Sequence, residues 1–263
     1  LAYYGLCFLL VLPLCRLDAV TLAAIALSTA LVSPQLRFLI NGVMDKEMAF
    51  DPFVTLLISG MFPAITWIPF IIAGMAVARL NLTKVTTRRW LATAGMALAV
   101  LGYLGSALAL HYVPGVAQTI TAYGGDVGDL WWSDAGGFYS FRKFGGEADW
   151  LWVASPHSET TFSILGNTGV ALLVLAISLV VSDTRLRVLT GPIVAVGSMS
   201  LTAYVLHIGG IWVVKSGWSP SLYLLGGFVL ATSAFAMLWR RAFGRGPLEA
   251  LMGKAADLSR CVP

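Results

Sequence analysis

Charged side chains are scarce in this sequence of 263 residues. Asp, Glu, Lys and Arg make up 11% of the residues, against about a quarter in soluble globular domains, and 58% of the residues are hydrophobic. This composition excludes an ordinary soluble domain. Because lipid offers no partners for open backbone hydrogen bonds, we predict an all-α fold, a polytopic transmembrane helix bundle in the cell membrane that contacts membrane lipids.

Cysteine and histidine are equally scarce, with three of each. Cys7 and Cys15 lie in the first apolar run and Cys261 lies in the C-terminal tail, so neither a zinc-site spacing nor a disulfide framework is present. The formal net charge of +4 comes from basic residues at the ends of apolar runs, not from a basic face with a nucleic-acid motif. We therefore expect no metal cofactor and no nucleic-acid partner.

Seven apolar runs approach the length of about 20 residues with which a helix crosses a bilayer. We expect spans at residues 1–15, 19–36, 52–79, 90–112, 160–182, 191–214 and 220–239. Residues 1–242 then form the membrane bundle, and residues 243–263 form a tail with a short amphipathic helix. The chain starts inside an apolar run, without an initiator Met or a basic leader, so we expect that it is a fragment that lacks its N-terminus.

Most Lys and Arg residues fall in the loops on one side of these runs, and most Asp and Glu residues fall on the other side. The positive-inside rule makes the basic side cytoplasmic. The C-terminus is then cytoplasmic, and the long loop at residues 112–159, rich in aromatic residues, glycines and carboxylates, is extracytoplasmic. With a cytoplasmic N-terminus, the number of missing spans must be odd.

The long loop ends in the run SPHSETTF. One interpretation is helix initiation, with Ser155 as N-cap, Pro156 in the first turn and Glu159 facing the positive end of the helix dipole. It does not account for His157, whose protonated form that dipole disfavours. The alternative is catalysis, because a neutral imidazole beside a carboxylate can act as a general base. The catalytic candidates are His157 and Glu159, and the nearby substrate-binding candidates are Ser158, Thr161 and Asn167.

The sixth apolar run, GPIVAVGSMSLTAYVLHIGG, contains polar residues at helical spacing. On one continuous helix four small or polar residues share a face: Gly197, Ser200, Tyr204 and His207. This stripe either faces a water-filled cavity or holds helices together, with Thr202 or Tyr204 bonding a neighbour. Helix packing explains His207 least well. Further substrate-binding candidates are therefore Ser200, Tyr204 and His207.

Two prolines, Pro63 and Pro69, flank Trp67 in the third apolar run. They either kink the helix around a cavity or mark a packing irregularity. In the first case Trp67 is a substrate-binding candidate, and the pattern alone does not separate the two interpretations.

The last apolar run ends in WRRAFGRGPLEALM, which places several arginines at the cytoplasmic surface. Anchoring to lipid head groups explains such a cluster. The alternative is a phosphate-binding patch for a nucleotide-bearing donor, because guanidinium groups fork around phosphate oxygens. The cofactor-binding candidates on this interpretation are Arg240, Arg241 and Arg245.

Several segments, in this order and spacing, resemble the C-terminal part of the YeiB-like bacterial membrane protein family: YYGLCFLLVLPLCRL, TWIPFIIAGMAVARLNL, SPHSETTFSILGNTGVALLVLAISLVV, GSMSLTAYVLHI and FGRGPLEALM. That family is grouped with heparan-alpha-glucosaminide N-acetyltransferase-like membrane acyltransferases. The resemblance implies about three further helices ahead of Leu1, which hold part of the active site. It also implies transfer of an acyl group from cytoplasmic acetyl-CoA, or a similar acyl-CoA, to a carbohydrate or lipid-linked acceptor on the outer face.

Two other functions stay open on the sequence. A transporter or flippase for a cell-envelope precursor would use the polar stripe as its route, although we find neither an inverted repeat nor an intramembrane carboxylate to support it. A non-catalytic membrane subunit would use the glycine-rich loop to recruit a partner. The sequence also leaves open whether copies of the chain associate.

Overall fold

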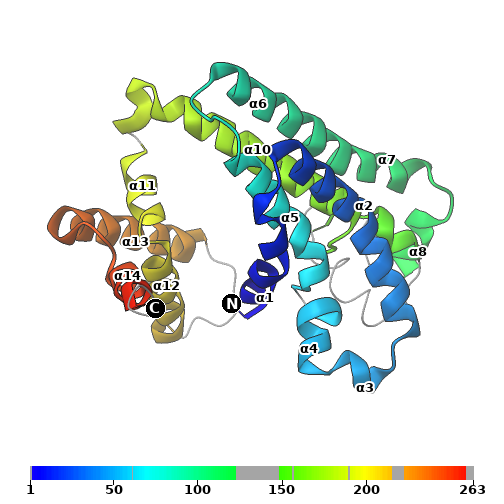
Figure 1. Cartoon of the computed structure of the whole chain (residues 1–263). Helices are drawn as coiled ribbons and strands as arrows, with labels where there is room; N and C mark the ends of the chain where they lie inside the picture. Colours follow the sequence, from blue (N-terminus) through cyan, green and yellow to red (C-terminus); the bar gives the residue numbers. More distant parts are fainter. Residues whose placement is uncertain are drawn as a thin grey trace. The chain divides into compact units, whose positions relative to one another are not determined.

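The computed structural model describes residues 2–60, 62–122, 148–155, 157–188, 190–214 and 222–258. Within these ranges all regular structure is helical and no strand occurs, which confirms the predicted all-α class. The chain divides into two compact units, unit 1 at Leu1–Leu179 and unit 2 at Val180–Pro263 (Figure 1). The central part of the long loop, residues 123–147, lies outside the described residues.

Unit 1 holds the site described below. Its elements are α1 (Ala2–Val11), η1 (Leu12–Arg16), α2 (Ala19–Val43), α3 (Lys46–Ala49), α4 (Pro52–Val54), η2 (Thr55–Ser59), α5 (Ala64–Ala78), α6 (Val85–Ala99), η3 (Val100–Leu104), α7 (Gly105–Tyr112), α8 (Val116–Ala122), η5 (Ala148–Trp152) and α10 (Thr161–Ser182). The segments η2 and η3 are single π-helical turns, a feature that often marks functional sites. From α10 the chain enters unit 2, with η6 (Arg185–Val188), α11 (Gly191–Gly197), α12 (Ser200–Val214), α13 (Leu222–Phe243) and α14 (Pro247–Leu258).

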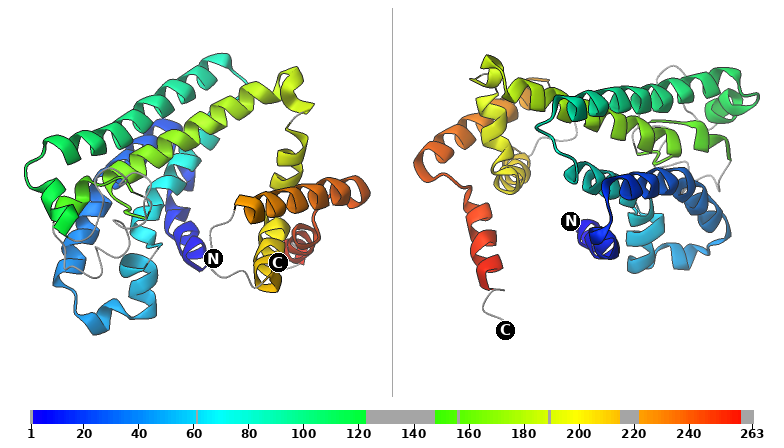
Figure 2. Two further views of the ribbon diagram at one scale, coloured as in Figure 1. Left: turned by 180° about the vertical axis from the view of Figure 1, so that it is seen from behind. Right: turned by 45° about the horizontal axis from the view of Figure 1, so that its top comes forward.

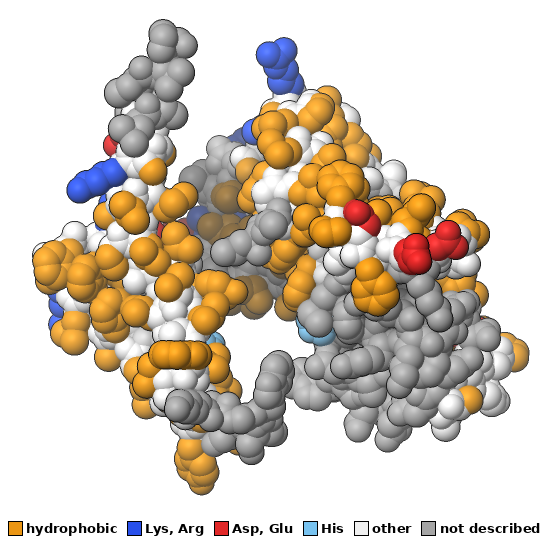
Figure 3. All heavy atoms as spheres, turned by 90° about the horizontal axis from the view of Figure 1, so that it is seen from below, with side chains coloured by type: hydrophobic (Ala, Val, Ile, Leu, Met, Phe, Trp, Pro, Cys, Tyr) orange, Lys and Arg blue, Asp and Glu red, His pale blue; other side chains and the backbone are white. Residues whose placement is uncertain are grey.

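Four described helices are long and apolar enough to cross a membrane: Ala19–Val43, Val85–Tyr112, Thr161–Ser182 and Leu222–Phe243. Two bent helix pairs, Pro52–Ser59 with Ala64–Ala78 and Gly191–Gly197 with Ser200–Val214, raise the number to six if each pair is one span. The first expected span forms a shorter apolar helix, Tyr3–Arg16. Hydrophobic side chains cover most of the described surface in Figure 3, as helices surrounded by lipid require.

An apolar cluster packs α1, α2 and α5 together. Its buried members are Val11, Leu22, Ala26, Ile72 and Ala76. Asp18 starts α2 as its N-cap, because its carboxylate accepts hydrogen bonds from the backbone N–H groups of Val20 and Thr21. The cluster thus holds α2 beside α5, and these two helices supply Arg37 and Trp67 to the site.

Small residues bring a second helix pair into backbone contact. The continuous helix α6–η3–α7 lies beside α10 in both views of Figure 2. A Cβ atom added to Gly102 would lie within 3.0 Å of backbone atoms of Gly166 and Phe162, and one added to Gly169 would lie equally close to Gly95. Such close approach is typical of helix pairs that associate in lipid, where van der Waals packing replaces the hydrophobic effect.

The two described ends of the long loop pack on each other. Leu110, Val116, Ile120, Trp150 and Val153 form a buried apolar cluster. Beside it, the Thr119 hydroxyl donates a 2.5 Å hydrogen bond to the Asp149 carboxylate. The segment that enters the site from residue 153 onwards is therefore anchored to the end of α7.

The sixth expected span is broken in unit 2. α11 ends at Gly197, α12 begins at Ser200, and the two axes differ by 88°. At the break the Ser198 hydroxyl donates to the carbonyl of Ala195, an alternative to helix continuation that serine side chains offer. The predicted stripe was therefore wrong for Gly197, because the prediction assumed one continuous helix.

Thr202 and Glu249 join α12 to α14 by reciprocal caps. The Glu249 carboxylate accepts hydrogen bonds from the Thr202 backbone N–H (3.0 Å) and hydroxyl (2.6 Å), and the Thr202 oxygen accepts from the Leu248 N–H. Partial burial raises the pKa of Glu249, but these bonds outweigh it and leave the pKa below its usual value. The predicted role of Thr202 as a bond between helices is confirmed.

Candidate functional site

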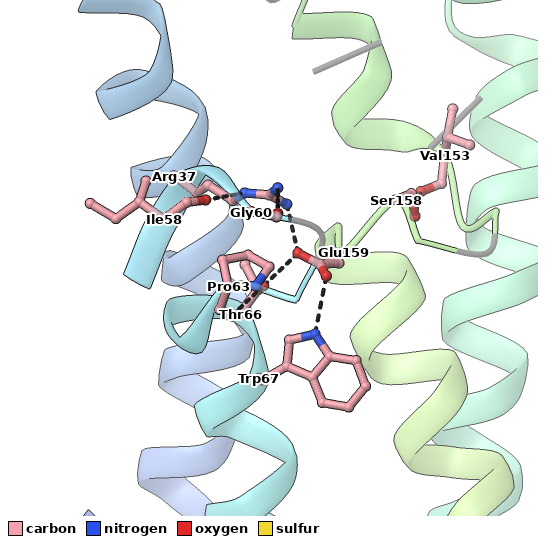
Figure 4. Close-up of polar contacts among 9 residues, drawn as sticks. All are labelled: Arg37, Ile58, Gly60, Pro63, Thr66, Trp67, Val153, Ser158 and Glu159. Atoms are coloured by element: carbon pink, nitrogen blue, oxygen red, sulfur yellow. Dashed lines mark hydrogen bonds and ion pairs between the residues drawn. The ribbon is translucent and has the colours of Figure 1, made fainter. Parts of the chain in front are cut away.

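A buried carboxylate, that of Glu159, is the centre of the site. One oxygen, Oε2, accepts hydrogen bonds from Arg37 at 2.7 Å and from the Thr66 hydroxyl at 2.8 Å. The other, Oε1, accepts from the indole Nε1 of Trp67 at 3.0 Å. These donors come from α2 and α5, whereas Glu159 lies just before α10 (Figure 4). The carboxylate therefore ties three segments of unit 1 together.

The Arg37 guanidinium also donates hydrogen bonds to two backbone carbonyls. Its Nε donates to the carbonyl of Ile58 at 3.0 Å, and its Nη2 donates to the carbonyl of Gly60 at 3.3 Å. Those carbonyls lie at the end of the π-helical turn η2, where the helix breaks before α5. The expected span at residues 19–36 was too short, because α2 continues to Val43 and buries the Arg37 side chain.

Hydrogen bonds between its own residues hold the segment that precedes α10. The hydroxyls of Ser158 and Thr160 both donate to the carbonyl of Val153, at 3.1 and 2.5 Å. Thr160 also caps α10, because its oxygen accepts a hydrogen bond from the N–H of Ser163. The predicted helix start at Ser155 was therefore wrong: α10 begins at Thr161 and its cap is Thr160.

Two residues of this segment have left-handed backbone conformations. His157 has φ of 60° and Glu159 has φ of 52°, and among the described residues no other non-glycine has a positive φ. Each such residue costs on the order of 1–3 kcal/mol and persists where surrounding contacts impose it. Here the hydrogen bonds of Ser158, Glu159 and Thr160 fix the backbone next to His157 and thereby stabilise its left-handed conformation.

A cavity of about 850 Å³ opens beside this segment. His157 and Glu159 line it, together with an aromatic wall formed by Phe62, Trp67 and Phe70. The His157 ring meets the Phe62 ring edge-on, with centroids 5.7 Å apart. Pockets of this size with a few convergent polar groups are typical of ligand sites.

The lining of this cavity also includes a chain of three hydrogen-bonded polar side chains. The Tyr103 hydroxyl donates to the Asn167 carbonyl oxygen at 2.9 Å, and the Asn167 amide nitrogen donates to the Ser163 hydroxyl at 3.2 Å. Tyr103 lies in the π-helical turn η3, and Ser163 and Asn167 are one turn apart on α10. All three line the cavity, so it offers both donors and acceptors to a ligand.

Four predicted residues, Trp67, His157, Glu159 and Asn167, line this one cavity. Two neighbours have structural partners instead: Ser158 bonds to Val153, and the Thr161 hydroxyl donates to the carbonyl of Ala30 and accepts from Gln35.

The remaining predicted residues lie in unit 2. Ser200 and Tyr204 are exposed on α12, and the His207 ring stacks on Phe228 at 5.1 Å. Arg240 and Arg241 lie in the last turn of α13, where cations suit the negative end of the helix dipole. Arg245 follows α13, and its carbonyl accepts a hydrogen bond from the indole of Trp239.

Sequence reasoning missed Arg37, Thr66, Tyr103 and Ser163. Each is a polar residue within or next to an apolar run. The rule that ionisable groups at membrane depth are functional candidates would have found Arg37 if its helix had been extended far enough. Thr66 and Tyr103 carry no comparable signal, because single hydroxyl groups are common in membrane helices.

The pKa of Glu159 predicts how the stability of the protein changes with pH. Burial raises the pKa of this carboxyl from 4.5 to about 7, against the lowering effects of Arg37, Thr66 and Trp67. Because the folded protein then holds the proton more tightly than the unfolded chain, the free energy of unfolding is expected to fall as pH rises from about 4.5 to about 7. Thermal unfolding in detergent between these pH values tests this. The slope should flatten in Glu159→Gln, and an unchanged slope would contradict the assignment.

The described helices define a helical membrane protein. Residues 144–259 match a family model described as Protein of unknown function (DUF418), a family of membrane proteins, and over this range the chain is similar to that family. The match includes the SPHSETTF run, α10 and the helices of unit 2. No curated protein and no solved structure matches the chain.

Proposed function

We propose that the chain is part of a membrane acyltransferase of the YeiB-like type and that the acceptor binds in the cavity of unit 1. The observation that carries the proposal is the lining of this cavity, in which His157, with a left-handed backbone conformation, occurs together with aromatic and polar side chains. Strained residues that surrounding contacts hold in place occur mainly at active sites and ligand clamps. The resemblance noted in the sequence supplies the reaction type.

His157 is the general base in this proposal. Its imidazole takes the proton from an acceptor hydroxyl or amine as that group attacks the acyl carbonyl, and returns it to the leaving thiolate. Glu159 has a different task. Its two oxygens already accept bonds from Arg37, Thr66 and Trp67, so it positions the backbone that carries His157.

The acceptor that best fits this cavity is a carbohydrate. Phe62, Trp67 and Phe70 provide apolar ring faces for the C–H side of a sugar, and Tyr103 and Asn167 provide hydrogen-bonding groups for its hydroxyls. Acetyl-CoA or a similar acyl-CoA is the proposed donor, with Arg240, Arg241 and Arg245 as its phosphate partners. The donor assignment rests on the resemblance and on the charge of these side chains.

His157→Ala is expected to lower acyl transfer by about 10²–10⁴-fold, the usual contribution of a general base. Transfer of radiolabelled acetyl from acetyl-CoA to hexosamines or hexoses is measured in membranes that contain the whole protein. His111→Ala is the matched control, because His111 is exposed on α7 and is not among the residues that line the cavity. Equal transfer by the two variants would contradict the assignment of the base.

A transporter is the second candidate function. The break at Gly60 and Pro63, between η2 and α5, adjoins the cavity, and discontinuous helices commonly form substrate sites in transporters. Uptake or flipping of a sugar-linked precursor that persists without an acyl donor and in His157→Ala would favour this function over acyl transfer.

A further inference from the structure

A second cavity of about 530 Å³ lies in unit 1 between α2, α5, α6 and α10. Its described lining residues are mainly alanines and leucines, and among them only Thr168 and Trp90 have a polar side-chain group. α2, α6 and α10 belong to helices that are long and apolar enough to cross a membrane, and α5 belongs to a bent pair that is long and apolar enough if it forms one span. The occupant of this space must therefore be apolar.

The two cavities adjoin each other. Ile164 of α10 lines both of them. On α5 the consecutive residues Pro69 and Phe70 line the second and the first cavity respectively. The two cavities are therefore immediate neighbours, with the buried side chain of Ile164 at their common border.

The length of the second cavity suits a hydrocarbon chain. Along α2 its lining runs from Ala30 back to Ala19, which is about 16 Å at the rise of an α-helix. Half of a typical hydrocarbon core is about 15 Å. The cavity is therefore about as long as the tail region of one leaflet.

The lining of the first cavity indicates which kind of lipid head group can bind there. No Lys or Arg is among its described lining residues, so a phosphate head group would meet no free cation there. Hydroxyl and amide groups from Tyr103, Ser163 and Asn167, together with the aromatic rings of the same lining, favour an uncharged head group rich in hydroxyls.

From this juxtaposition we infer that the ligand is a glycolipid, with an uncharged sugar in the His157 cavity and one hydrocarbon chain in the alanine-lined cavity. The inference rests on the proposed function in so far as the ligand is the acceptor. The lipid site itself depends only on the two cavities.

Photolabelling tests the inference. The whole chain in phosphatidylcholine nanodiscs is exposed to dodecyl glucoside that carries a diazirine in mid-chain, and labelled residues are located by mass spectrometry. We expect saturable labelling of cavity-lining residues such as Leu98 and Leu172, displaced by dodecyl glucoside but not by free glucose or dodecylphosphocholine. Labelling spread evenly over outward-facing residues such as Leu31 and Val174, or displaced equally by dodecylphosphocholine, would overturn the inference.

Two substitutions on α6 form a matched pair, one that fills the alanine-lined cavity and one that does not. Ala94→Phe adds a ring at an exposed residue that lines the alanine-lined cavity, and Ala97→Phe adds the same ring at an exposed residue of α6 that does not. We expect labelling to fall at least tenfold in Ala94→Phe and to stay unchanged in Ala97→Phe, with equal melting temperatures. Undiminished labelling in Ala94→Phe would overturn the inference.

Acyl transfer separates the inference from the proposed function. Transfer to dodecyl glucosaminide and to free glucosamine is compared in both variants. If Ala94→Phe loses acyl transfer to dodecyl glucosaminide but keeps transfer to free glucosamine, the acceptor is a lipid. Transfer that is equal for both acceptors and unaffected by Ala94→Phe overturns the lipid acceptor and leaves the acyltransferase standing. Saturable labelling without any transfer overturns the acyltransferase and leaves the lipid site standing.

Discussion

Arg37→Met is expected to destabilise the protein by about 3–5 kcal/mol at pH 8, where most of the Glu159 carboxyl is ionised. The substitution leaves a buried carboxylate without its cation, because the 2.7 Å ion pair is 6% and 8% exposed on its two sides. It also leaves the carbonyls of Ile58 and Gly60 without their donor. Unfolding in mixed detergent micelles, followed by proteolysis or fluorescence, gives the change in free energy.

The double variant Arg37→Met/Glu159→Leu separates charge from packing. Because removal of both charges leaves no unpaired ion, it should recover at least half of the loss. Arg89→Met is the matched control: Arg89 is exposed on α6, and its loss should change stability by about 0.5 kcal/mol or less. A double variant as unstable as the sum of the single variants would show that the pair is not coupled.

Gly102→Val is expected to separate α10 from the helix α6–η3–α7. The added Cβ atom would lie within 3.0 Å of backbone atoms of Gly166 and Phe162, which cannot move aside as a flexible side chain can. Overpacking usually costs about 1–3 kcal/mol where side chains can adjust, so the loss here should exceed about 3 kcal/mol. Because Tyr103 is the next residue, its hydrogen bond to Asn167 in the lining of the first cavity should be lost as well. Melting temperature and solvent accessibility of a cysteine at Ser163 measure the two effects.

Gly169→Ala and Gly74→Ala form a matched pair for this prediction. An added methyl group on Gly169 would meet the backbone of Ala99, whereas one on Gly74, in the middle of α5, would meet no atom within 4 Å. Gly74→Ala should leave stability unchanged or raise it by up to about 1 kcal/mol, because alanine favours the helix. Equal destabilisation by the two substitutions would contradict backbone contact between the helices.

The Arg37–Glu159 ion pair and the contact between the glycines of α6–η3–α7 and α10 both position residues that line the first cavity. Arg37 and Glu159 hold the segment that carries His157 against α2 and α5, while the glycines hold Tyr103 near Asn167. The two π-helical turns lie at these two places. Disturbing either element should therefore change the cavity even where the helices themselves persist.

The sequence by itself determined the class of the protein and much of its local structure. Long apolar runs can satisfy their backbones only as helices in lipid, so composition was enough to predict an all-α membrane protein. The run SPHSETTF was also visible as a site candidate, because His157 did not fit a simple helix start. Thr202 was visible as a residue that bonds helices.

Only the tertiary structure decided which residues form the site. Glu159 and Arg37 are 122 residues apart in the chain, and no local pattern records their pairing. The bonds that hold Glu159 in its left-handed conformation and the two cavities that share Ile164 likewise arise from contacts between distant segments. The physical reason is that hydrophobic run length and capping act within a few turns of helix, whereas burial of a charge is acceptable only where the whole fold brings its partners to it.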